Sequence, residues 1–362
     1  MSQKKEVTPQ PTSNPSLPDD LLMSCLARVS RSYYRILSLV SKSFGSLGHT
    51  ESCLYVCLTS YSDTHWFTLC WKPDQTIMTN DTSMKKKKSS GYYLARVPIP
   101  HSPRAYFPSL VAVGSDIYNI GSNSRYDLTS SSVSVMDCRS HKWHEAPSMR
   151  VGLASLSASF IDGKIYVAGS SGIYAKKNSF EVFDTKTKTW DPEPPISCSM
   201  TECSFSHSRS SCIDGKFHVV AADKNAVAYN SKEGRWDQVE RRMCHYMFLR
   251  CYCEIENVLY SAFKSAIRWY DTNAKEWRDL MGLVGLPKLP PCYFVRLADY
   301  GGKLAVLWEE DIPSSGEKMI WSAEIMLERR KNHIIWGKVE WYDYVLTVPK
   351  GYYFVKVLAA IV

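Results

Sequence analysis

The sequence has no apolar run long enough to cross a membrane. A spanning helix needs about 20 apolar residues, and the nearest candidate, Tyr352 to Val362, is short and interrupted by Lys356. Residues 1–16 are polar, contain three prolines and lack the apolar segment of a signal peptide. We therefore expect a disordered tail over 1–16, no membrane partner, and an intracellular protein of the cytoplasm, the nucleus or both. Its twelve cysteines should then be reduced thiols.

The sequence also has little net charge once one segment is set aside. There are 44 basic and 36 acidic residues, which gives +8, and Lys85 to Lys88 supply four of those charges. A solvated lysine-rich loop explains this run better than a nucleic-acid surface. We expect no nucleic-acid partner. Hydrophobic residues make up 44% of the chain and aromatic residues 12%, which is ample for a packed core.

Motifs of catalysis and of metal binding are missing as well. The chain has no P-loop, dinucleotide fingerprint or nucleophile motif. The spacing of Cys251 and Cys253 suits no zinc knuckle, so buried or half-buried thiols on a strand are the better interpretation. His141 and His144 are expected in an exposed turn. We predict no cofactor and no metal, while an enzyme with a site formed by loops of unknown placement stays open as an alternative.

What the sequence does contain is a repeat. Four tryptophans recur 47, 46 and 41 residues apart, and each follows an acid or amide by six positions. The tryptophans are Trp143, Trp190, Trp236 and Trp277, and the residues six positions earlier are Asp137, Asp184, Asn230 and Asp271. A period just above 40 residues of strand-type sequence is typical of a four-stranded propeller blade. We expect each indole to fill the wedge between neighbouring sheets.

Turn signals divide each repeat into strands. Asp162-Gly163 reads as a two-residue hairpin turn, because both central positions of a type I′ turn adopt positive φ. Equivalent places in the other units hold Gly114-Ser115, Asp214-Gly215, Glu256-Asn257 and Gly301-Gly302. Each hairpin leads to a third strand, which ends at the acid or amide six positions before the tryptophan. The tryptophan then begins a fourth strand.

The repeats predict a closed ring. Five units cover 105–148, 149–195, 205–241, 247–282 and 293–341, and the last carries Trp336 and an insertion near Pro313 to Gly316. Strands near 54–58, 65–71, 92–97 and 352–362 remain, and together they make a sixth blade from both ends of the chain. Closure removes exposed sheet edges. We predict a mostly β, six-bladed propeller over 53–362, with five blades as the alternative.

The repeats resemble kelch repeats. Residues 149–195 are the clearest copy, with an Asp-Gly-Lys turn, Tyr-Val-Ala-Gly-Ser, Val-Phe-Asp and a tryptophan six positions later. The double glycine of the kelch family corresponds to Gly121-Ser122 and Gly169-Ser170. It is replaced by Ala221-Ala222 and Phe263-Lys264 in later units.

Residues 17–48 differ from all that follows. Apolar residues recur at helical spacing through two stripes, and Gly45 and Gly48 end the pattern. The segment resembles an F-box, the motif that docks the Skp-type adaptor of cullin ubiquitin ligases. The positions that carry the resemblance, and the adaptor contacts it implies, are Leu17, Pro18, Leu21, Leu22, Leu26, Val29, Val40 and Phe44. Only Gly45 to Ser52 separate Phe44 from the first strand, so the box is shortened at its C-terminal end.

Together the two parts resemble the plant F-box/kelch-repeat family over nearly the whole chain. The resemblance implies a non-catalytic substrate receptor, monomeric outside its complex, whose box binds the adaptor and whose propeller binds an unknown target protein. The alternative is a propeller scaffold that no longer recruits a ligase because its box is truncated.

Overall fold

This computed structural model describes residues 25, 29, 52–61, 63–71, 90–99, 101–121, 129–171, 177–191, 203–222, 225–330 and 334–362. Tight hairpin turns connect many of its strands. Both central residues are left-handed at Asp162-Gly163 (φ 50° and 81°) and at Asp214-Gly215 (52° and 68°). Glu256-Asn257 and Gly301-Gly302 share this geometry, which is that of type I′ turns. The predicted turns are confirmed at these four places.

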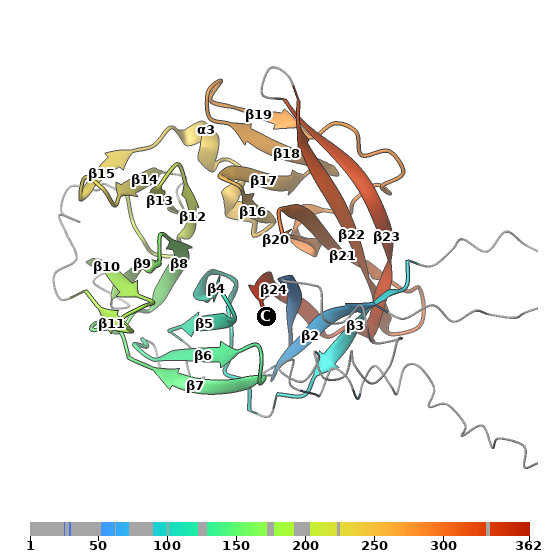
Figure 1. Cartoon of the computed structure of the whole chain (residues 1–362), viewed down its shortest axis with the longest axis horizontal. Helices are drawn as coiled ribbons and strands as arrows, with labels where there is room; N and C mark the ends of the chain where they lie inside the picture. The colour runs from blue at the N-terminus through green and yellow to red at the C-terminus, as the bar shows by residue number, and fades with distance from the viewer. Residues whose placement is uncertain are drawn as a thin grey trace, which may run out of the picture.

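The strands form six four-stranded antiparallel sheets, the blades of a propeller (Figure 1). Blade 1 contains β4 (Leu110–Val113), β5 (Asp116–Ile120), β6 (Val133–Asp137) and β7 (Lys142–Ala146). Blade 2 contains β8 (Ser155–Ile161), β9 (Lys164–Ser171), β10 (Lys177–Asp184) and β11 (Thr189–Trp190). Blade 3 contains β12 (Arg209–Ile213), β13 (Lys216–Val220), β14 (Ala226–Asn230) and β15 (Arg235–Gln238). Blade 4 contains β16 (Tyr252–Ile255), β17 (Val258–Phe263), β18 (Ala266–Asp271) and β19 (Glu276–Asp279).

Blade 5 is longer than predicted. It contains β20 (Val295–Tyr300), β21 (Lys303–Asp311), β22 (Glu317–Arg329) and β23 (Ile335–Pro349). The expected end at 341 was therefore wrong, because β23 continues for a further eight residues in register with β22. The supposed insertion at Pro313 to Gly316 is the turn between β21 and β22, and two β-bulges accommodate the extra length.

The sixth blade joins the two ends of the propeller. Its strand order is β24 (Tyr352–Ile361), β1 (Ser52–Ser60), β2 (Asp63–Trp71) and β3 (Tyr92–Val97). The strand β24 is innermost and pairs antiparallel with β1, from Ser52 opposite Ile361 to Ser60 opposite Tyr352. The predicted six-bladed ring with a shared blade is confirmed, and we call this sheet the closing blade.

Short helical turns connect the blades. The helix α3 (Arg241–Cys244) and the 3-10 turn η5 (Met247–Leu249) lie between blades 3 and 4. The turns η3 (Phe107–Ser109) and η6 (Cys292–Phe294) immediately precede β4 and β20. No helix in the part of the chain that the structure describes is both long and apolar enough to span a membrane.

Six hydrophobic clusters hold the ring together, and each lies where two neighbouring blades meet. The cluster of blades 2 and 3, for example, includes Tyr166, Phe180, Phe205 and Phe217. The cluster that joins the closing blade to blade 1 includes Tyr55 and Trp66, which are almost fully buried. Burying side chains of this size stabilises a fold by about 1.5–3 kcal/mol each, so the core of this ring is distributed around its circumference.

The recurring tryptophans lie on the outermost strands and point to the preceding blade. The ring of Trp143 packs on Trp66 of the closing blade (centroids 6.0 Å apart), and that of Trp236 packs on Phe180 of blade 2 (5.0 Å). The indole Nε1 of Trp190 donates to the carbonyl oxygen of Pro147 (2.7 Å). Trp277 donates in the same way to Arg242 (2.8 Å). All four thus contact the preceding blade or the segment that leaves it.

Candidate functional site

The six inner strands surround an axial channel. Its cavity of about 480 Å³ is bounded by residues from β4, β8, β12, β16, β20 and β24. Inner strands run in the same direction: Ser157 and Ser159 of β8 contact Ser208 and Ser210 of the β12 segment through hydroxyl pairs of 2.9 and 2.8 Å. The ring therefore has a start face, where the inner strands begin, and a turn face, which carries the hairpin turns after them.

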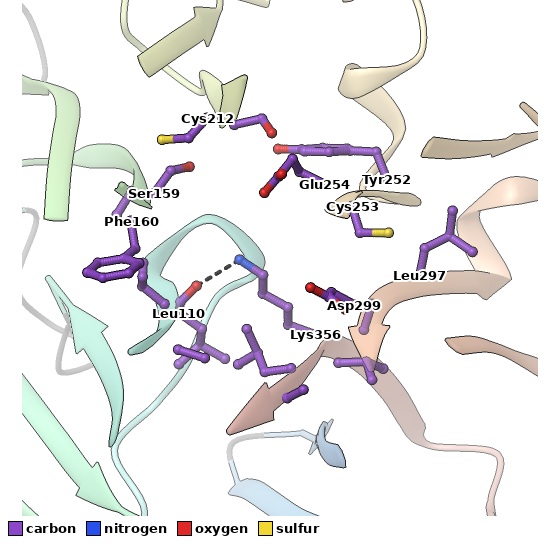
Figure 2. A pocket seen from close by; sticks show the side chains of 18 of the residues that line it. Leu110, Ser159, Phe160, Cys212, Tyr252, Cys253, Glu254, Leu297, Asp299 and Lys356 are labelled. Carbon is purple, nitrogen blue, oxygen red and sulfur yellow. Dashed lines mark hydrogen bonds between the residues drawn. The ribbon is translucent and has the colours of Figure 1, made fainter. Parts of the chain in front are cut away.

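Lys356 of β24 projects into this channel (Figure 2). Its Nζ donates to the carbonyl oxygen of Leu110, the first residue of β4, over 2.7 Å. Burial of the ammonium group, followed by the positive charge of Arg209, lowers the pKa of Lys356 to about 8. No carboxylate pairs with Lys356 in the described part of the chain.

Carboxylates occupy the other end of the channel. Glu254 and Asp299 line it close to the turns at Glu256-Asn257 and Gly301-Gly302 (Figure 2). Partial burial raises the pKa of both groups, and the charge of Asp299 adds to the shift of Glu254. The channel is therefore positive toward the start face and negative toward the turn face, so an anion would enter from the start face.

The cysteines beside the channel are poor nucleophiles. Burial raises the pKa of Cys212 and Cys253, which line the channel, and a protonated thiol attacks slowly. Cys253 lies half-buried in β16, as expected, whereas the buried Cys251 comes immediately before that strand. Within the described ranges, no group of three or more His, Cys, Asp or Glu residues is arranged to hold a metal ion.

His141 corrects one expectation. We expected it in an exposed turn, but it is buried, and its Nε2 lies 3.1 Å from the hydroxyl of Tyr55 in β1. The same hydroxyl donates to the carbonyl oxygen of Cys138 (2.9 Å). The turn after β6 is thus packed against the closing blade. His144 is exposed, as expected.

The acid or amide six positions before each tryptophan caps a turn. The side-chain oxygen accepts hydrogen bonds from the backbone N–H groups two and three residues later in three of the four units. Asp184, for example, accepts from Thr187 (3.0 Å) and Lys186 (2.8 Å), and these bonds lower its pKa. Asp137 accepts from the N–H of Arg139 and from the hydroxyl of Ser140. These positions are structural turn residues.

The two predicted glycine positions lie where neighbouring strands are close. A Cβ at Gly169 would lie 2.5 Å from the carbonyl oxygen of Ser155 and 2.8 Å from Leu153. Gly121 has φ 64°, and a Cβ there would meet Leu156 at 2.6 Å. Both glycines allow blade 2 to pack tightly at the start face.

Most of the predicted adaptor contacts lie outside the described residues. These are Leu17, Pro18, Leu21, Leu22, Leu26, Val40 and Phe44. Val29 is described, and it is half-buried at a bend. Their role stays a prediction. The channel residues Lys356, Glu254 and Asp299 were missed by sequence reasoning, because a single charged residue in a strand gives no sign that it faces the axis.

Comparisons with known proteins agree with this architecture. The family model of the FKB95 kelch-repeats domain matches residues 66–346, and that of the F-box domain matches residues 15–53. An F-box/kelch-repeat protein of Arabidopsis thaliana is 58% identical over 370 residues, which cover 95% of this chain and 99% of the relative. A second from the same plant is 50% identical over 393 residues, which cover 100% of this chain and 98% of that protein. The chain belongs to the F-box/kelch-repeat family.

Proposed function

We propose that the protein is the substrate-recognition subunit of a Skp–cullin–F-box ubiquitin ligase. One observation carries the proposal: a single chain joins an F-box match at residues 15–53 to a closed propeller whose first strand begins at Ser52. The F-box binds the Skp-type adaptor, and the propeller binds the target protein. Catalysis then belongs to other subunits, and this chain contributes proximity between target and conjugating enzyme.

The propeller is suited to a receptor role because it is rigid and offers connecting loops on two faces. The hydrophobic clusters fix every blade to its neighbours. The raised pKa values of the channel thiols weigh against a nucleophilic site there. The protein accordingly acts in the cytoplasm, the nucleus or both, as a monomer until it meets the adaptor.

Binding to the adaptor is the decisive experiment. The full chain is co-expressed with a Skp-type adaptor, and the two should elute as one complex in size-exclusion chromatography. Leu21→Asp and Phe44→Asp should abolish co-elution, whereas Tyr61→Ser, at a propeller side chain that is 95% exposed, should leave it intact. If the wild type fails to bind while a control F-box protein binds, the ligase role is rejected.

If the wild type does not bind the adaptor but still captures a defined target protein, its client, the result would favour the alternative of a propeller scaffold without a ligase. Capture is measured by affinity purification after proteasome inhibition. Where the wild type does bind the adaptor, the reconstituted ligase should ubiquitinate the client, and it should not do so when Leu21→Asp replaces the wild type. A stable client that is bound but not modified would identify the scaffold.

A further inference from the structure

A second cavity opens on the start face, beside the mouth of the axial channel. Its volume is about 310 Å³, and Phe107 lines both it and the channel. Apolar walls come from Phe107, Leu153 and Leu156, and hydroxyl groups from Tyr106, Ser109 and Ser155. The remaining polar side chains are basic: His207, Arg209 and Arg250. We call this cavity the basic pocket. It contains no acidic lining residue among the described ones.

Arg209 is the buried cation of this pocket. The residue is only 9% exposed, and its Nη1 donates to the carbonyl oxygens of Ser208 (2.8 Å) and His207 (3.3 Å). Its Nε is buried and has no hydrogen-bond partner within the described chain. A buried guanidinium that lacks a counter-ion and leaves a donor unpaired is energetically costly. An anion in the pocket would offset this cost.

The neighbouring charges increase that cost. Burial lowers the pKa of Arg209, and Arg250 lowers it further although Tyr252 opposes the change. Arg209 in turn repels Lys356, whose Nζ lies 4.9 Å from the centroid of Phe107. Neither Arg209 nor Arg250 forms an ion pair within the residues that the structure describes. Glu254 and Asp299 lie toward the turn face of the channel and do not offset these cations.

Two residues of the pocket also have strained backbones. His207 (φ 54°) and Arg250 (φ 58°) are left-handed, and each stands two residues before an inner strand, β12 or β16. Non-glycine residues adopt this conformation mainly at turns and caps, and Arg250 is the C-cap of η5. Here this conformation places two basic side chains, both exposed, at the rim of one cavity.

We infer that the basic pocket binds a carboxylate or phosphate group borne by an acidic segment of the target protein. This inference rests on the proposed function, since it assigns the client to the start face. Guanidinium groups match the planar, two-oxygen geometry of these anions. Arg250 and Tyr106, which is 40% exposed, supply at the rim the residue types that dominate binding energy in protein interfaces. The pocket accepts one side chain, and its apolar wall holds the stem of that side chain.

The test uses a fluorescein-labelled, end-capped hexaglutamate peptide and measures anisotropy at fixed ionic strength, with hexaglutamine as the neutral control. All proteins are full-length and carry glutamine in place of Lys85 to Lys88, because that lysine run would attract any polyanion. Arg250→Gln should weaken hexaglutamate binding at least tenfold, and Arg250→Lys should restore only part of it, because lysine keeps the charge but not the forked donor geometry. Arg139→Gln is the matched loss of one charge, at an exposed turn between β6 and β7 on the turn face, and should bind as the parent does.

Competition with pyrophosphate distinguishes an acidic protein segment from a free small anion as the ligand of the pocket. It should compete with hexaglutamate for the parent protein and have no effect on the residual binding to Arg250→Gln. If pyrophosphate binds but hexaglutamate neither binds nor competes, the occupant is a free small anion and the assignment to a target segment is overturned. Equal affinities of the parent and Arg250→Gln would overturn the pocket itself.

The outcome is distinguishable from failure of the proposed function. Arg250→Gln should still co-elute with the Skp-type adaptor, because the substitution lies in the propeller. Loss of the captured client with retained adaptor binding supports the inference. A client that remains bound to Arg250→Gln at wild-type affinity contradicts the pocket and leaves the receptor role standing, whereas absence of adaptor binding by the wild type rejects the receptor role alone.

Discussion

Glu309 accepts a 3.0 Å hydrogen bond from the backbone N–H of Phe354 through its Oε1, so a side chain of blade 5 holds the last strand of the ring. The carbonyl oxygen of Phe354 accepts a second hydrogen bond, over 2.9 Å, from Nη2 of Arg296, which also belongs to blade 5. Both charged side chains are buried. The strand β24 is therefore fixed by β1 on one edge and by polar side chains of blade 5 on the other.

Deleting residues 352–362 should abolish cooperative unfolding. The truncated chain loses the inner partner of β1 and the buried side chains Phe354, Val357 and Leu358. Each stabilises the fold by about 1.5–3 kcal/mol, and their sum is comparable with the ~5–15 kcal/mol of a whole domain. Circular dichroism should show no sharp thermal transition. Ile361→Ser, at a side chain 63% exposed, is the control and should melt within a few degrees of the wild type. A truncated chain that melts like the wild type would contradict the shared blade.

The buried ion pair of Glu309 should be strongly coupled. Its Oε2 lies 2.5 Å from Nζ of Lys318, and the two side chains are only 6% and 4% exposed. Glu309→Gln leaves the lysine charge uncompensated and should lower the free energy of unfolding by about 3–5 kcal/mol. The double variant with Lys318→Met should lose less than Glu309→Gln alone. Urea denaturation of both single variants and the double variant measures the coupling, and additive losses would refute it.

Gly234→Ala should lower the free energy of unfolding by about 1–2 kcal/mol for conformational reasons alone. Gly234 has φ 66°, and a Cβ there would meet no atom within 4 Å. Other units fill this turn position with left-handed His141, Lys188 and Lys275, so the fold requires the conformation. Gly234→Asn should cost less than alanine, because asparagine tolerates it better. Equal losses for the two variants in urea melts would indicate a contact instead.

Lys356 should make stability depend on pH in a defined window. Its folded pKa of about 8 lies below the ordinary value of 10.5, so the unfolded chain binds more protons between these values. Stability must then rise with pH over that window and is lowest, for this group, below about 8. Compared with Lys356→Met, the wild type should gain in free energy of unfolding from pH 8 to 10.5. Urea melts at several pH values test this, with Lys338→Met as the surface control. Parallel curves for wild type and Lys356→Met would contradict the burial of this ammonium.

Much of the ring was predictable because its signals are local and repeated. Turn pairs such as Asp162-Gly163 fix both φ values, and the tryptophan period fixes blade length. The closing blade followed by counting the strands that were left over. Blade 5 was misjudged because its strands β22 and β23 lengthen together, which moved the end of the repeat beyond Trp341 without changing its strand order.

The binding features of the ring were not predictable in the same way. Lys356 reads in the sequence as an interruption of an apolar strand, and only the ring geometry turns its side chain toward the axis. The basic pocket combines residues from four segments, near Tyr106, Leu153, His207 and Arg250, and each segment lies more than 40 residues from the next. These segments share no sequence motif. His141 was misplaced for a similar reason, since its partner Tyr55 belongs to a strand 86 residues earlier.

The innermost strand of the closing blade, β24, follows all the other strands of the ring in the sequence. While translation proceeds, β1 exposes the edge that β24 will later cover, and an uncovered edge recruits foreign strands. The ring therefore closes only after β24 has been translated, and a chain that stops before Tyr352 keeps the edge of β1 open.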